Sequence, residues 1–264
     1  MEAWLLAHEG PLRLAVFLGL FALLAGLQTW RPLRGVTGIW RRFGRHLALA
    51  ALGTLLVRLC FPWLAVAAGA WTQAEGVGLL PWLGAPPALQ LLLGVVLLDL
   101  CIYWQHRIFH RLPWLWRLHR MHHSDIEFEL STAIRFHPLE IALSMAIKLA
   151  CVAALGAPPL AVLAFEILLN ACSLFSHADL RLSAVIERPL RALLVTPDMH
   201  RIHHSVRADE THSNFGFCLS LWDRIFASYR PRASADDATM AIGLERFRGA
   251  REQGLRALLM QPLR

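Results

Sequence analysis

The chain has 264 residues, of which 56% are hydrophobic and 17% charged, and its mean hydropathy is +0.45. Soluble domains are typically about 45–50% apolar, so this composition argues against a soluble protein and favours an integral membrane protein. The net charge of +7 comes almost entirely from arginines beside apolar runs, a pattern that argues against nucleic-acid binding and indicates membrane topology.

The cysteines give no sign of a disulfide framework. Five occur, at positions 60, 101, 151, 172 and 218, and no two of them form a C-x-x-C pair. Their odd number and scattered spacing predict neither paired disulfides nor a zinc ribbon. We therefore expect reduced thiols and an active region that faces the cytoplasm.

Five apolar runs divide the chain, each close to the roughly 20 residues that a helix needs to cross a bilayer. We predict one domain over residues 1–264. The first run lacks the basic segment of a signal peptide, so we interpret it as an uncleaved span. Pro138 favours a helix start. The predicted spans cover about 12–30, 47–71, 88–104, 138–155 and 160–175.

The arginines predict how these spans are threaded. The loop from Arg31 to His46 is rich in arginine and should be cytoplasmic by the positive-inside rule, which puts the N-terminus outside. The predicted fold class is all-α: an integral membrane helical bundle of four to five spans with a cytoplasmic histidine-rich helical cap. The cap covers 105–137 and 177–264. We expect the bacterial inner membrane, or the endoplasmic reticulum in a eukaryote.

Histidines concentrate in one stretch of the chain. Eleven of the thirteen fall between His106 and His212, all on one side of the membrane in this threading. Residues three and four apart share a helix face, so histidines in H-x-x-x-H and H-x-x-H-H spacing would point together. Neutral imidazole is the commonest metal ligand. The plausible ligands are His106, His110, His119, His122, His123, His137, His177, His200, His203 and His204.

Ten ligands exceed the four of a single tetrahedral site, so two metal ions fit better. Zinc hydrolysis is not favoured, because the chain lacks H-E-x-x-H and no glutamate stands within a histidine group. The Glu-x-x-His pairs of carboxylate-bridged di-iron bundles are also missing. An all-imidazole pair of ions suits iron, with copper the alternative on ligand type.

Polar residues inside the spans carry further expectations. A hairpin of the last two spans about residues 156–157 would place Lys148 opposite Glu166, which lowers the cost of burying either charge. Arg58 is a candidate partner for Asp99. Metal-bound histidine usually donates its other N–H to a carboxylate or carbonyl, and the alternative role is helix–helix contact. The candidates for such support of the histidines are Asp99, Glu140, Glu166 and Asn170.

The three histidine groups resemble the histidine boxes of membrane di-iron hydroxylases and desaturases. The segments 135–140, 196–205, 214–216 and 221–226 are similar to the sterol desaturase/fatty acid hydroxylase superfamily. The resemblance runs from about Asp99 to Tyr229. Two departures are His212, where an acidic residue is expected, and Ala227-Ser228, where glycine and threonine usually precede the tyrosine.

The resemblance implies an O2-dependent enzyme with two iron ions, zinc being a substitute after overexpression. It makes the eight box histidines ligands, and His137 and His177 match two additional histidines of the family. The expected reaction is hydroxylation of a C–H bond of a sterol, fatty acyl or related membrane lipid. Desaturation is the alternative, because both reactions begin with the same hydrogen abstraction.

Two further expectations concern partners and the competing class of function. No haem, flavin or iron–sulfur motif is visible, so electrons must come from a separate donor protein. A membrane metal-binding or transport protein is the alternative of a different class. A transporter would hold its ligands near mid-span, whereas these histidines lie beyond the predicted span ends.

Overall fold

The computed structural model describes residues 1–36 and 38–264, and within those ranges it is all-helical without a named strand. The helices are α1 Glu2–Ala7, α2 Glu9–Trp30, α3 Ile39–Cys60, α4 Ala65–Glu75, α5 Leu79–Trp82, α6 Pro87–Arg111, α7 Pro113–His123, η1 Leu130–Ile134, α8 Pro138–Leu155, α9 Pro159–His177, α10 Ala184–Leu193, α11 Pro197–His203, α12 Ala208–Thr211, α13 Leu221–Ile225, α14 Leu255–Met260 and η2 Gln261–Leu263.

Among the described residues, five helical segments are long and apolar enough to cross a membrane: Glu9–Trp30, Ile39–Trp82, Pro87–Arg111, Pro138–Leu155 and Pro159–His177. The chain is therefore an integral membrane helical bundle, as its composition predicts. The second segment differs from the expected single helix over 47–71. Helix α3 ends at Cys60 and α4 begins at Ala65, because Pro62 cannot donate the hydrogen bond that would continue the helix.

Helices α8 and α9 form the predicted hairpin, which turns at Gly156. This residue has a φ of 62°, a left-handed conformation that glycine adopts without strain. A Cβ there would lie 2.4 Å from the backbone oxygen of Val77. The turn is thus closed by contact with the segment between α4 and α5, and only glycine fits it.

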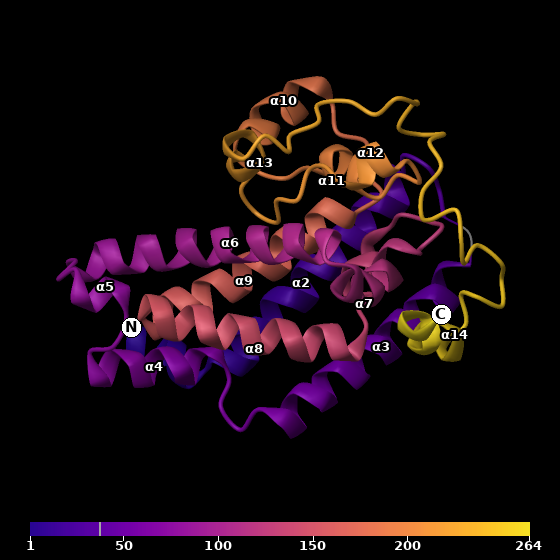
Figure 1. The fold of residues 1–264 in the computed structure, drawn as a ribbon. Coiled ribbons are helices and arrows are strands. Elements are labelled where there is room, and N and C mark those ends of the chain that lie inside the picture. The colour runs from indigo at the N-terminus through magenta and orange to yellow at the C-terminus, as the bar shows by residue number, and fades with distance from the viewer. Residues whose placement is uncertain (37) are drawn as a thin grey trace.

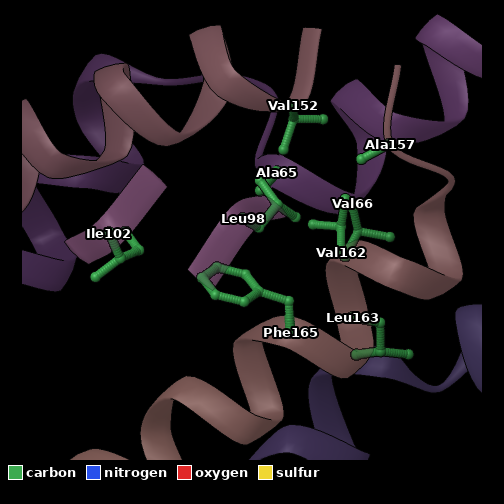
Figure 2. Close-up of a cluster of buried hydrophobic side chains, with 9 residues drawn as sticks. All are labelled: Ala65, Val66, Leu98, Ile102, Val152, Ala157, Val162, Leu163 and Phe165. Atoms are coloured by element: carbon green, nitrogen blue, oxygen red, sulfur yellow. The ribbon is translucent and has the colours of Figure 1, made fainter. Parts of the chain in front are cut away.

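A hydrophobic core joins α4, α6, α8 and α9 near this turn. It contains Ala65, Leu98, Val152, Val162 and Phe165, all buried (Figure 2). Burial of such side chains stabilises the fold by roughly 25 cal/mol per Å² of apolar surface in water. The N-terminus lies at this end of the bundle, and α7, α11 and the C-terminus lie at the other (Figure 1).

The cap is fastened to the bundle through Asp99 of α6. Its carboxylate accepts hydrogen bonds from Trp222 Nε1 at 2.8 Å and from the backbone N–H groups of Leu219 at 3.1 Å and Cys218 at 3.3 Å. Arg58 is exposed and does not meet it. The expected Arg58–Asp99 pair is therefore wrong: Asp99 holds the loop before α13 instead.

The arginine-rich loop lies at the same end as the cap. The backbone N–H of Arg34 donates to Asp179 at 3.1 Å, and its side chain donates to the carbonyl oxygen of Asp237 at 3.0 Å. Arg42 pairs with Asp125 at 2.7 Å. The loop, the cap and the C-terminus thus share one end of the bundle, and that this end is cytoplasmic stays a prediction.

Candidate metal centre

In the described part of the chain, nine buried histidines gather into two clusters whose ring nitrogens lie within 4.8 Å of one another. Each cluster mixes residues from different sequence groups. On α7, for example, His119 and His123 turn to one cluster and His122 to the other. The first cluster is His106, His110, His119, His123 and His203; the second cluster is His122, His177, His200 and His204.

Helix starts and ends place these side chains. Helix α6 continues to Arg111, so His106 and His110 lie four residues apart on its last turns. Pro113 begins α7 and Pro197 begins α11, at the first helical turn, where the missing N–H costs nothing. The Thr196 hydroxyl accepts from the backbone N–H of Met199 and caps α11. The histidines therefore lie at the ends of helices that meet at the same end of the bundle.

Hydrogen bonds at Nδ1 orient five of the rings. In the first cluster, His106 donates to the carbonyl oxygen of Phe215 at 2.8 Å and His203 to that of Ser213 at 2.7 Å. His119 Nδ1 lies 2.6 Å from Glu140 Oε1. A partner at Nδ1 fixes the tautomer and leaves the Nε2 lone pair free for a metal.

The second cluster has the same arrangement. His177 Nδ1 lies 2.8 Å from the carbonyl oxygen of Ser173, and His122 Nδ1 lies 3.2 Å from that of Arg135. Every residue has a backbone carbonyl, so the sequence could not predict these partners. Of the polar side chains predicted to support the histidines, only Glu140 is bonded to one.

The free nitrogens fit metal ions. His106 and His203 bring their Nε2 atoms to 3.0 Å, and His177 and His200 bring theirs to 3.1 Å. Metal–imidazole bonds are about 2.0–2.1 Å, so ligands of one ion lie roughly 3 Å apart. Within residues 1–36 and 38–264, Nε2 of His110, His119, His123 and His204 has no hydrogen-bond partner. Buried polar atoms left unpaired are costly, and a metal ion in each cluster would complete them.

Burial also keeps these rings in the state that binds metal. Desolvation, reinforced by neighbouring imidazoles, holds the pKa of five of the buried histidines well below the ordinary value. They are neutral at physiological pH and available as ligands. These residues are His122, His123, His200, His203 and His204.

Behind the second cluster lies a buried charge network that sequence reasoning missed. Asp125 Oδ2 accepts from Arg42 at 2.7 Å and from the Thr132 hydroxyl at 2.9 Å, and Arg135 Nη1 is 3.5 Å from its other oxygen. Burial alone would raise the pKa of Asp125, but Arg135 and Arg42 lower it well below its usual range. Because the Arg135 carbonyl accepts from His122, this network anchors the backbone beside the cluster.

Two histidines differ from their expected roles. His137 lies outside both clusters: its Nε2 is 3.1 Å from the carbonyl oxygen of Leu259, and its Nδ1 accepts from the backbone N–H of Leu139 at 3.2 Å. It caps α8 and is not placed to bind metal. His212, which stands where the family resemblance suggests an acidic residue, brings its Nδ1 to 3.3 Å from that of His110.

The charges inside the spans meet as the hairpin predicts. Lys148 Nζ lies 2.6 Å from Glu166 Oε1, and Arg13 of α2, which the hairpin argument could not place, lies 2.9 Å from Oε2. Asn170 donates to the Glu166 carbonyl at 2.9 Å. Glu166 thus contacts α2 and α8, Asn170 bonds within its own helix α9, and Asp99 contacts the cap; none of the three bonds a histidine.

The first cluster borders a cavity inside the bundle. This cavity, of about 280 Å³, lies between α3, α6, α8 and α9, and His106 and His119 form part of its wall. Apolar side chains alternate in its lining with polar ones, which besides the two histidines are Thr54, Gln105, Glu140, Ser144, Lys148, Asn170 and Ser173. The cavity gives an alkyl chain a place beside the imidazoles.

On the cap side, a surface pocket of about 580 Å³ approaches the same cluster. Its wall includes Trp116, Arg120, Arg207 and Arg246. The Trp116 ring centroid lies 4.8 Å from that of His110 and 5.3 Å from that of His123. The Trp116 ring therefore lies between the pocket and these two histidines.

Comparisons with known proteins agree with this site. The chain is 34% identical over 185 residues to ornithine lipid hydroxylase OlsE of Rhizobium tropici, an alignment that covers 67% of this chain and 51% of that protein. It is 33% identical over 168 residues to alkylglycerol monooxygenase of Homo sapiens and 35% identical over 155 residues to that of Danio rerio. These two alignments cover 62% and 58% of this chain.

The chain spans about half the length of the first relative, and 34% and 33% of the human and zebrafish proteins. No solved structure matches it. The family model for fatty acid hydroxylase matches residues 91–228, more than half of the chain and all three histidine groups. The chain therefore belongs to the fatty acid hydroxylase family, as its histidine boxes predict.

Proposed function

We propose that this protein is an O2-dependent di-iron hydroxylase that oxidises a C–H bond of a membrane lipid. The observation that carries the proposal is the pair of buried imidazole clusters beside a cavity within a membrane bundle. His106, His110, His119, His123 and His203 would hold one iron, and His122, His177, His200 and His204 the other. We omit His137, because both of its ring nitrogens face backbone groups.

Iron is favoured over zinc because zinc has no redox chemistry, and the named relatives are a hydroxylase and a monooxygenase. When bound, the two irons would supply O2 activation for C–H oxidation. The protein's part is to orient and to exclude water. Glu140 holds the Nδ1 proton of His119, and the buried ring of Phe128 packs against His177 with a centroid distance of 5.6 Å.

The reaction we favour is hydroxylation rather than desaturation, because both kinds of relative are named for oxygen insertion. Ornithine lipids and alkylglycerols, which those names contain, are the first substrates to test. The cavity between the spans supports a lipid substrate that enters from the bilayer.

Electrons would come from a separate donor protein docking over the cap pocket. Three arginines, Arg120, Arg207 and Arg246, outnumber Asp209 and Glu245 in its lining, and this small excess of positive charge suits an acidic partner. Trp116 would then lie between the donor and the first cluster. This arrangement also implies that the cap faces the cytoplasm and that the N-terminus is outside.

The decisive experiment combines metal analysis with isotope labelling. Protein reconstituted with Fe(II) in detergent should hold close to two irons per chain, as the two clusters require. With a chemical reductant, ¹⁸O2 and 1-O-hexadecylglycerol or an ornithine lipid, mass spectrometry should find one ¹⁸O in the product. At most one iron in a carefully prepared sample would contradict the two-metal site. A desaturated, unlabelled product would identify a desaturase. Metal moving across proteoliposomes, without lipid oxidation, would identify a transporter.

A further inference from the structure

One face of α8 carries a polar stripe along the cavity. Glu140, Ser144 and Lys148 follow at intervals of four residues, about 6 Å apart along the helix axis. Each is joined to another helix: Glu140 Oε1 to His119 of α7 at 2.6 Å, Ser144 to Gln105 of α6 at 2.9 Å, and Lys148 to Glu166 of α9 at 2.6 Å. These contacts fix the stripe in place.

Two acceptor atoms of this wall remain free. In the part of the chain that the structure describes, Glu140 Oε2 and Gln105 Oε1 are buried without a hydrogen-bond partner. The Glu140 residue is only 3% exposed. The Gln105 amide donates its N–H to the Ser144 hydroxyl at 2.9 Å, and in this orientation its carbonyl oxygen is left without a donor. A buried acceptor with no donor is unfavourable.

Both free acceptors lie beside the first cluster. Gln105 directly precedes His106 in the chain, and Glu140 is bonded to His119. All four residues line the cavity. The lining also includes the apolar side chains of Ile102, Phe109, Phe136, Ile141 and Met145. The residues that carry the two acceptors thus line the cavity near the metal centre, together with apolar side chains suited to an adjoining alkyl chain.

Building on the proposed function, we propose that the substrate is a lipid that places its polar end in this cavity, where a hydroxyl or amide N–H donates to Gln105 Oε1 and Glu140 Oε2. The oxidised carbon then lies within a few bonds of that donor, not in the distal part of an acyl chain. A plain acyl or hydrocarbon chain has no donor and would leave both acceptors unpaired. Sites built to bond a substrate O–H or N–H discriminate strongly against analogues that lack it.

The test is binding of two matched probes without turnover. 1-O-hexadecylglycerol has two hydroxyl donors, and its di-O-methyl ether has the same chain and no donor. Binding to the iron-loaded protein in detergent, without O2, should be about tenfold tighter for the diol, which corresponds to about 1.4 kcal/mol. Gln105→Leu, which removes one acceptor, should reduce this preference to about threefold or less.

Two more variants keep the test specific. Gln105→Glu retains an acceptor and should keep the preference, which separates hydrogen bonding from a general loss of packing. Thr54→Val removes a hydroxyl from α3, which also lines the cavity, and should keep it too. If Gln105→Leu does not fold, the comparison of the two probes in the wild type decides: equal binding would overturn the proposal, and a clear preference for the diol would support it.

The failures of the two proposals are distinguishable. Equal binding of both probes, no binding of the diol, or an unchanged preference in Gln105→Leu would overturn the polar-end proposal. The last result would indicate that the free acceptors bind only water. None of these outcomes touches iron content or oxygen insertion. If the diol is clearly preferred but no product contains ¹⁸O, the polar-end proposal stands and the proposed hydroxylase activity is refuted.

Discussion

The bundle buries two sets of polar side chains that differ in how they are completed. At the cap end, the histidine clusters leave several ring nitrogens without a partner among the described residues. Farther from the cap, Glu166 joins Lys148 at 2.6 Å and Arg13 at 2.9 Å, so each charge faces one of opposite sign. The histidine nitrogens lack partners until a ligand binds, whereas the charged side chains find their partners within the protein.

This difference teaches which set serves chemistry and which serves the fold. Buried nitrogens with free lone pairs raise the free energy of the folded state unless a metal ion completes them. A paired charge needs no ligand, and breaking it costs stability. Changes in the clusters should therefore alter metal content first, whereas changes in the Glu166 pair should alter stability first.

The largest effect is expected from the ligands. His203→Ala in the first cluster and His122→Ala in the second should each lower the metal content from two ions per chain towards one. Lipid oxidation should fall by more than about 100-fold, since removing a group that binds the reacting centre costs several kcal/mol. Elemental analysis and product mass spectrometry measure both.

His137→Ala is the matched control. It replaces a buried histidine that caps α8 outside both clusters, so both metal ions should remain. Loss of an ion in this variant would show that His137 is a metal ligand. If His203→Ala and His122→Ala both keep two ions, the clusters do not bind metal.

Acidification should have the next largest effect. The pKa values of His122, His123, His200, His203 and His204 are held well below their ordinary value in the folded protein, so the unfolded chain binds more protons below about pH 6.5. Stability therefore falls as pH drops from about 7 to about 5, by up to about 1.4 kcal/mol per pH unit for each such histidine.

Thermal unfolding of the metal-free protein in detergent across this range checks the direction. Metal should dissociate over the same range, because protons compete with it for the imidazoles. A melting temperature that stays constant or rises towards pH 5 would contradict neutral, buried rings in the clusters.

Glu140→Gln should weaken metal binding by about 10–100-fold, the usual consequence of removing a carboxylate that orients a ligand. Glu140 is bonded to His119 of the first cluster only, so one of the two ions should be affected. Asp99→Asn is the control, since that carboxylate holds the cap at Trp222. Competition with a metal-binding dye measures both. Equal weakening in the two variants would mean that the effect is a general loosening of the cap.

The sequence predicted the parts of this molecule that repeat with helical spacing. The histidine groups could be inferred because helices fix which residues share a face, the membrane spans from the length of the apolar runs, and the Lys148–Glu166 pair from the symmetry of the hairpin about residues 156–157. The break of the second span at Cys60–Ala65 was missed, since the apolar run continues through Pro62 and hydropathy does not register a lost hydrogen bond.

Contacts between distant segments were harder to infer. The assignment of His119 and His122 to different clusters depends on how α7 and α11 meet, and neither helix encodes its neighbour. The partners Phe215 and Ser213 act through backbone carbonyls, which every residue has. Asp99 was expected to support the histidines and His137 to match an additional histidine of the family, and tertiary contacts gave both residues other partners.

The smallest effect is expected from the intramembrane charges, and it tests whether they are only structural. Lys148→Met leaves Glu166 paired with Arg13 at 2.9 Å, so we expect a loss of about 1–2 kcal/mol, below the 3–5 kcal/mol of an uncompensated buried charge. Glu166→Gln removes the partner of two cations at once and should cost more. The double variant should lose less than the sum of the single losses, because the unpaired lysine is gone and Arg13 keeps Glu9 at 3.7 Å. Melting temperatures in detergent for the four proteins give the coupling, and iron content should stay at two per chain in all of them. Additive losses would mean that the pair contributes no coupling, and a loss of iron would show that the two buried sets are not independent.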